Sequence, residues 1–153
     1  MDEVVFSDEG SGMIRLWTYL KNTDLHAMSA FEALHGVMEY APLKRLRRFQ
    51  LFELSGSLDD ALQGFKVLNP NKEGYFVDIL PAVSVGEDEQ LFLCKVVSDS
   101  TFKWIVWEIL VDKFVTKEDV LANVLFSTSR KKGLLVNPVC EEVVFLDTAD
   151  VFG

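Results

Sequence analysis

Residues 67–73 of the chain read VLNPNKE, and residues 135–141 read LVNPVCE. Each copy places two apolar residues before Asn-Pro, two further residues and a glutamate after it, and then an apolar run that favours a β-strand. Proline disfavours the helical conformation at the residue before it, so each copy predicts a point where a helix ends and a strand begins. The residues that define this Asn-Pro motif are Asn69, Pro70, Glu73, Asn137, Pro138 and Glu141.

A helix is predicted ahead of each copy of the motif. Ser57, followed three residues later by Asp60, matches a capping box, in which two side chains at a helix start satisfy backbone N–H groups. Apolar residues then recur at helical spacing, which predicts a helix over residues 58–66. Thr116 begins a second match to the capping box and predicts a helix over residues 117–128.

A strand is predicted after each copy of the motif, over residues 75–85 and over residues 139–147. The chain therefore contains the succession of helix, motif and strand twice. Two interpretations stay open. One is an internal duplication with halves at residues 12–85 and 88–147, and the other is a chance match between two short phrases.

The rest of the chain adds further strands and another helix. Alternation of side-chain types predicts a strand over residues 13–21, and β-favouring residues predict strands within residues 43–54 and over residues 90–97. A stripe of apolar residues at helical spacing predicts a helix over residues 24–40. Residues 101–114 fit a helix or a strand, and their content of Ile, Val and Trp favours the strand.

These elements predict an α+β fold, with helices packed on one face of a mainly antiparallel sheet. A chain of 153 residues suits one domain, which we place at residues 12–150. Residues 1–11 carry four acidic side chains and are expected to form a flexible N-terminus. Residues 148–153 are expected to trail from the last strand.

The charge of the chain limits its classes of partner. The net charge is −9 at pH 7 and the pI is about 4.7, which disfavours nonspecific binding to nucleic acids and to anionic membranes. No stretch approaches the roughly 20 apolar residues of a membrane helix, and no basic and apolar leader opens the chain. We therefore expect a soluble, cytoplasmic protein that binds neither nucleic acid nor membranes.

The sequence contains no pattern typical of a catalytic or metal site. His26 and His35 lie nine positions apart on the helix predicted there, so their side chains point to roughly opposite faces. Cys94 and Cys140 are far apart in sequence and have no histidine beside them, which favours free thiols over metal ligands. We therefore expect no metal, no cofactor and no independent enzymatic activity.

A cluster of basic residues opens the strand predicted within residues 43–54. In an acidic chain such a cluster indicates a site for a phosphate-bearing ligand or for an acidic surface of a partner, because guanidinium and ammonium groups bind oxyanions. The alternative is a solvated start of the strand without any ligand. The residues concerned are Lys44, Arg45, Arg47 and Arg48.

Four aromatic residues, Trp17, Tyr19, Trp104 and Trp107, fall on predicted strand segments outside the apolar pattern of the core. If they lie exposed on a face of the sheet, they indicate a homo-oligomer or a place in a larger complex, because exposed aromatic patches are typical of interfaces. The alternative is that both faces of the sheet are covered from within the chain.

Two blocks of the sequence match the pattern of a known family. In residues 14–54 a predicted strand ends in Leu20-Lys21 and leads into a helix that contains ALHG at residues 33–36. In the second block a predicted helix is followed by GLLVNPVCEE at residues 133–142. Together they resemble the PurS family, the small subunit of phosphoribosylformylglycinamidine synthase, whose members close with a helix, a Leu-Leu-Ala-Asn-Pro-Val-Ile-Glu phrase and a last strand.

PurS proteins have about half the length of this chain. The resemblance therefore implies either a fused tandem pair of PurS-like units or one unit with an insertion at residues 55–115. It implies a non-catalytic assembly subunit that bridges a glutaminase and an ATP-dependent synthetase in purine biosynthesis, where PurS dimers help ammonia pass between the two enzymes. Two other functions stay open: a small regulatory module of ferredoxin-like build that binds an anionic metabolite, and an unrelated protein–protein interaction domain.

Overall fold

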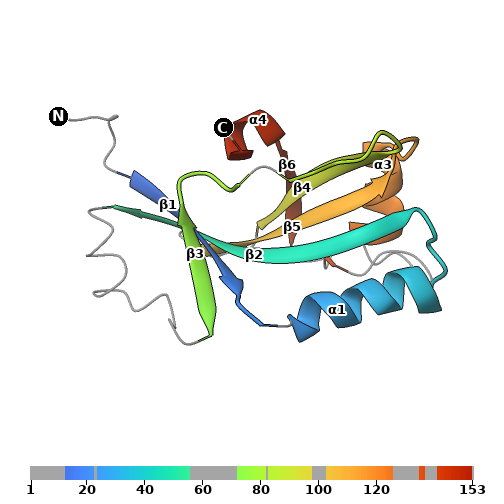
Figure 1. The fold of residues 1–153 in the computed structure, drawn as a ribbon, viewed down its shortest axis with the longest axis horizontal. Coiled ribbons are helices and arrows are strands. Elements are labelled where there is room, and N and C mark those ends of the chain that lie inside the picture. Colours follow the sequence, from blue (N-terminus) through green and yellow to red (C-terminus); the bar gives the residue numbers. More distant parts are fainter. Residues whose placement is uncertain are drawn as a thin grey trace.

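The described part of the chain is built on one six-stranded sheet in which all neighbouring strands are antiparallel (Figure 1). A computed structural model describes residues 13–22, 24–55, 72–81, 83–97, 103–125, 135–136 and 141–152. The strands in sheet order are β3 (Glu73–Val77), β1 (Met13–Leu20), β2 (Leu43–Ser55), β5 (Lys103–Asp112), β4 (Glu89–Val97) and β6 (Glu142–Leu146).

Helical segments flank this sheet. The first begins as α1 (Leu25–Phe31) and continues as the π-helical segment η1 (Glu32–Val37). The second begins as α3 (Lys117–Val120) and continues as η2 (Leu121–Leu125). A further short helix, α4 (Thr148–Phe152), lies at the end of the described chain.

The first two helices begin where the sequence predicts, because polar side chains satisfy N–H groups that have no partner within the helix. The Asp24 carboxylate accepts a hydrogen bond from the Ala27 amide at 3.1 Å. At α3 the Thr116 hydroxyl accepts from the Asp119 amide, and the Asp119 carboxylate accepts from the Thr116 amide, both at 3.1 Å. The capping box predicted at Thr116 is therefore confirmed.

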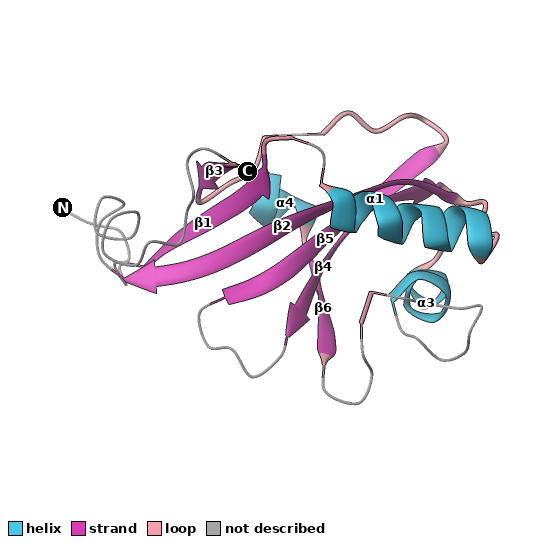
Figure 2. Cartoon of the chain, turned by 90° about the horizontal axis from the view of Figure 1, so that it is seen from below, coloured by secondary structure: helices cyan, strands magenta, loops and turns pink. Residues whose placement is uncertain are grey.

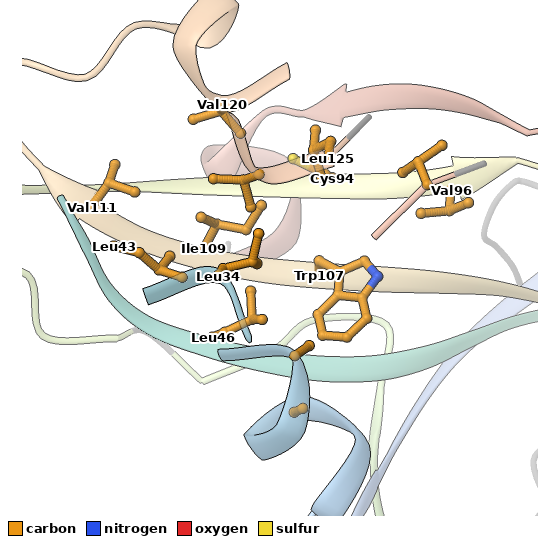
Figure 3. Packing of buried hydrophobic residues seen from close by; sticks show 14 of the residues in the cluster. Leu34, Leu43, Leu46, Cys94, Val96, Trp107, Ile109, Val111, Val120 and Leu125 are labelled. Carbon is orange, nitrogen blue, oxygen red and sulfur yellow. The ribbon is translucent and has the colours of Figure 1, made fainter. Parts of the chain in front are cut away.

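One face of the sheet packs against α1 and α3 (Figure 2). In β5 the side chains of Trp107, Ile109 and Val111 point to this face, because side chains alternate along a strand. They pack in one cluster with Leu34 of η1 and Val120 of α3, and all five are buried (Figure 3). This confirms the prediction, made from the content of Ile, Val and Trp, that residues 101–114 contain a strand.

The opposite face packs against α4 and the segment that follows β3. Trp17, Phe49 and Val106 point this way and form a second buried cluster with Leu80 and Val151. The prediction that helices cover one face therefore holds for α1 and α3 but is wrong for α4. The last described residues form this helix, instead of trailing from the last strand, because the buried Val151 anchors them on the sheet.

Described segments of the chain pack on both faces of the sheet, which favours the second of the two alternatives for the aromatic residues. Trp17 is fully buried, and Trp107 is only 3% exposed. Tyr19 and Trp104 are partly buried against the second cluster. The indole N–H of Trp17 donates to the Asp78 carbonyl at 3.1 Å, so its polar atom also has a partner within the chain. These aromatic residues thus give no support for a homo-oligomer.

Strand β3 is shorter than the strand predicted over residues 75–85. It ends at Val77 because Asp78 has a φ of 66°, a left-handed conformation that breaks the extended chain. The Asp78 amide donates to the Arg15 carbonyl at 2.7 Å, and the Asp78 carboxylate accepts from the Arg15 amide at 3.1 Å. These two bonds hold the turn against β1.

Of the six residues of the Asn-Pro motif, the structure describes only the two glutamates. Glu73 is the first residue of β3, and Glu141 directly precedes β6. β3 and β6 are the two edge strands, so the motifs lead into opposite edges of the sheet. Several predicted features lie outside the described residues: Asn69, Pro70, Asn137, Pro138, Cys140, the helix over 58–66 and the N-terminal residues 1–11.

The two predicted halves share one strand order, β3-β1-β2 in the first and β6-β4-β5 in the second. In each half the first strand is central, the second meets the other half, and the third lies at the edge. Because β2 and β5 are antiparallel, a two-fold rotation at their contact would exchange the two halves in strand order and in strand direction. Among the described helices, α1 follows the first strand of its half and α3 follows the second, and the helix predicted over 58–66 lies outside the described residues. Duplication stays a hypothesis that the strand order favours.

Candidate functional site

Strand β2 has strand neighbours on both sides only along its second half. β1 runs beside it as far as the pair Thr18–Gln50. Beyond that pair β1 stays with β3 up to Leu20 and so leaves β2. β5 covers the other side of β2 from its first residue onward. Residues 43–49 of β2 therefore have one side without a strand neighbour in the part of the chain that the structure describes.

A hollow of about 710 Å³ lies along this open side of β2. It is lined by all residues of β2 from Lys44 to Phe49, together with Tyr19 and Leu20 at the end of β1. Successive residues of a strand point to opposite faces, so the hollow extends around the edge of β2 onto both faces. We call this space the β2 hollow. It contains all the basic residues that the sequence predicts as a binding site: Lys44, Arg45, Arg47 and Arg48.

Two of these basic residues bind one buried carboxylate. Glu108 of β5 is 1% exposed. The Arg47 guanidinium donates to both of its oxygens, at 2.6 Å from Nε to Oε1 and 2.9 Å from Nη2 to Oε2. Arg45 adds a longer contact of 3.4 Å from its Nη2 to Oε1. Because Arg47 alone donates to both oxygens, the contact from Arg45 is not needed to stabilise this buried carboxylate.

The other two basic residues have acidic partners at the ends of the β2 hollow. The Lys44 ammonium lies 3.2 Å from the Asp112 carboxylate. The Arg48 guanidinium lies 3.5 Å from the Asp24 carboxylate and donates to Nδ1 of His26 at 2.8 Å. His26 must be the acceptor of that bond, because a guanidinium only donates.

Aromatic rings form one wall of the β2 hollow. Tyr19 and Phe76 stack with centroids 5.2 Å apart, and Tyr19 meets Phe49 edge to face at 6.4 Å. The Arg47 guanidinium lies over the Phe49 ring, 5.6 Å from its centroid. Such a wall adds apolar contact area to the cationic groups. The sequence pattern does not indicate this wall, because its rings come from three strands.

The opposite wall comes from helix α1. Met28 and Phe31 both line the β2 hollow, and Met28 is 44% exposed. Phe31 also packs against the first buried cluster. Their exposure follows from the departure of β1, which leaves this part of α1 and β2 uncovered by a further strand.

The described residues contain no arrangement for nucleophilic or metal chemistry. Burial raises the pKa of the Cys94 thiol well above its ordinary value, so this sulfur is not a reactive thiolate. His26 lies against Trp107, and His35 stacks on Phe31, so the histidines remain apart as predicted. Within the described chain no three His, Cys, Asp or Glu side chains gather as metal ligands. Nor does any described helix have the length and apolarity needed to cross a membrane.

Comparisons with known proteins leave the geometry of the β2 hollow as the main guide to function. No family model matches the sequence, and no curated protein or solved structure matches the chain.

Proposed function

We propose that the chain is a non-catalytic binding subunit that receives an anionic partner in the β2 hollow. The single observation that carries this proposal is the convergence of four cationic side chains on one partly apolar hollow of an acidic protein. Their acidic partners in the described chain are Asp24, which lines the hollow, and Glu108 and Asp112 behind it, so four positive charges face three negative ones and one is in excess. A local excess of this kind attracts an anion although the whole chain carries −9.

The unused donors of the arginines make such binding chemically reasonable. A guanidinium has five N–H donors, and Arg47 uses two nitrogens on Glu108 while Arg45 uses one. Side-chain exposure is 41% for Arg45 and 46% for Arg47, so both side chains are partly exposed, although the Nε of Arg45 is buried without a hydrogen-bond partner in the described chain. A carboxylate or phosphate of a partner can bind these donors without breaking the contacts to Glu108.

Binding of a labelled hexaglutamate peptide to the full chain tests this proposal. The double variant Lys44→Gln with Arg45→Gln removes two charges from the β2 hollow and is expected to weaken binding roughly tenfold. The control Lys113→Gln with Lys117→Gln removes two charges elsewhere and should bind within about twofold of the unchanged chain. Equal weakening by both variants, or equal binding of hexalysine, would contradict a specific anion site.

The PurS-like version of this function is a second candidate, and the shared strand order of the two halves favours it. In that version the chain is a fused pair of PurS-like units of ferredoxin-like build, and it bridges a glutaminase and an ATP-dependent synthetase in purine biosynthesis. It predicts that the purified chain co-elutes with both enzymes in size-exclusion chromatography. Elution of the chain alone, in the presence of both at micromolar concentration, would rule this version out.

A further inference from the structure

We propose that the partner of the β2 hollow is an extended acidic segment of another protein, which adds to the sheet as a strand along the open side of β2. This inference rests on the proposed function and specifies the partner and its mode of binding. Strand addition is a general recognition mode in which backbone hydrogen bonds provide affinity and flanking pockets select side chains. The β2 hollow offers both.

The backbone of β2 is available for such pairing. β1 leaves β2 beyond Thr18, while β5 occupies only the far side. In a strand the N–H and C=O groups of alternate residues point to opposite sides, so beyond the register shift between Leu43 and Arg45, every second residue within 45–49 directs its groups to the open side. No backbone hydrogen bond from another segment to these groups occurs in the described chain beyond the bond from the Leu43 amide to Tyr40.

The β2 hollow is placed to receive the side chains of an added strand. Residues on one face of that strand would meet Met28 and Phe31 of α1, and residues on the other face would meet Tyr19 and Phe76. Because the hollow surrounds the edge of β2, both alternating rows of side chains find a wall. A small anion needs neither the open backbone nor two walls, so the geometry favours an extended chain.

Charge selects an acidic segment. Arg45 and Arg47 face the Tyr19 side together with Phe49, and Arg48 faces the opposite side. Asp or Glu residues on the first side would share the free donors of the two arginines. Apolar residues on the second side would cover the exposed surface of Met28. The expected partner therefore alternates acidic and apolar residues over about six positions, the length of an average strand.

Peptides with blocked backbones test strand addition separately from anion binding. The probe is a capped, labelled hexapeptide of alternating Glu and Val, compared with one N-methylated at its Glu residues and one N-methylated at its Val residues. All three have the same charge, but an added strand bonds β2 through only one of the two sets of N–H groups. We expect one N-methylated peptide to bind at least tenfold more weakly and the other to bind like the parent.

Two results would overturn strand addition and leave anion binding intact. In the first, both N-methylated peptides bind like the parent peptide. In the second, hexaglutamate binds but the alternating peptide does not. If neither peptide binds, the proposed function fails as well.

The position of the bound peptide is checked with Met28→Trp, which fills the hollow from α1, and with the control Leu25→Trp on the same helix outside the hollow. Only the first should weaken binding of the alternating peptide by tenfold or more; equal effects would place the peptide elsewhere.

Discussion

At the scale of single residues, Glu108 explains much of the basic cluster. It is the charged side chain that the described sheet buries almost completely, and a buried carboxylate is stable only with close cationic donors. Arg47 provides two such bonds from the neighbouring strand, directly opposite in the β2–β5 register. Arg47 thus stabilises the fold through Glu108, and the donors that Arg45 and Arg47 leave unused carry the capacity for a partner.

Replacing Arg47 should therefore destabilise the fold through the carboxylate it leaves behind. Arg47→Met is expected to lower the free energy of unfolding by about 2 kcal/mol, because Glu108 keeps only the long contact to Arg45. Adding Glu108→Leu removes the uncompensated charge and should restore most of that loss. Urea denaturation of the two single variants and the double variant measures this coupling. Strictly additive losses would contradict the assigned pair.

Cys94 should make stability depend on pH in the alkaline range. Burial raises the pKa of its thiol in the folded chain, so the folded state keeps the proton at a pH where the unfolded state has lost it. Stability is then fully present below the unfolded thiol pKa of about 9 and falls as pH rises above it, by up to about 1.4 kcal/mol per unit. Tyr40, whose pKa is raised by burial and by Asp119 and Asp112, adds a smaller decline only above about 10, because this side chain is only partly buried and solvent screens its interactions.

Urea denaturation between pH 8 and 10 checks this expectation, with Cys94→Val as the comparison. The slope of unfolding free energy against pH should be steeper for the unchanged chain than for Cys94→Val. A thiol reagent should also label Cys94 only at the rate of unfolding. Identical slopes for the two proteins would contradict the burial of an uncharged thiol.

At the scale of elements, the pairing of β1 with β3 shapes the β2 hollow. Gly74 lies directly opposite Tyr19 in the register, and a Cβ at Gly74 would collide with the Tyr19 ring. The glycine therefore allows the ring to lie flat over β3, where it stacks on Phe76. The aromatic wall of the β2 hollow depends on this one missing side chain.

Alanine at two glycines separates this packing effect from glycine's general effect on the chain. Gly74→Ala should cost about 1–3 kcal/mol of stability, because the Tyr19 ring must move, and should weaken binding of the Glu-Val peptide. Gly36→Ala, where a Cβ meets nothing, should raise stability by about 0.5–1 kcal/mol, since alanine favours helices. Thermal denaturation measures both changes in stability. If the two variants changed stability in the same direction, the close contact between Gly74 and Tyr19 would be contradicted.

The elements that local rules determine could be predicted from the sequence. The capping box at Thr116 and the apolar stripe over residues 24–40 identify two helices, and the content of Ile, Val and Trp identifies β5 as a strand. The end of β3 could not be predicted, because the turn at Asp78 is held by bonds to Arg15, 63 residues away. Helix α4 has only five residues, too few for a periodic pattern.

At the scale of the whole molecule, the same distinction applies to the candidate site. The four basic residues are neighbours in sequence and were predicted together. The β2 hollow around them was not, because it exists only where β1 turns from β2 to β3, and the aromatic wall comes from separate strands. The carboxylate bound by Arg47 is likewise 61 residues away. Pairing between strands that are distant in sequence thus decides whether a basic cluster lines a hollow or lies in open solvent.

The strand order of the whole sheet gives the binding site a particular setting. β2 is the inner strand of the first half, at the contact with β5, and the corresponding strand of the second half is β5 itself. β5 is covered by β4 and β2 on its two sides through most of its length. The two halves therefore differ at the site, and one chain is expected to bind one strand.

Amide hydrogen exchange of residues 44–49, measured by NMR with and without saturating Glu-Val hexapeptide, tests strand addition at the β2 hollow most directly. Beyond the register shift between Leu43 and Arg45, strand addition predicts that every second amide in this range slows at least tenfold on binding, while the amides between them, which already face β5, change little. Binding without slowing of any amide in this range would contradict it.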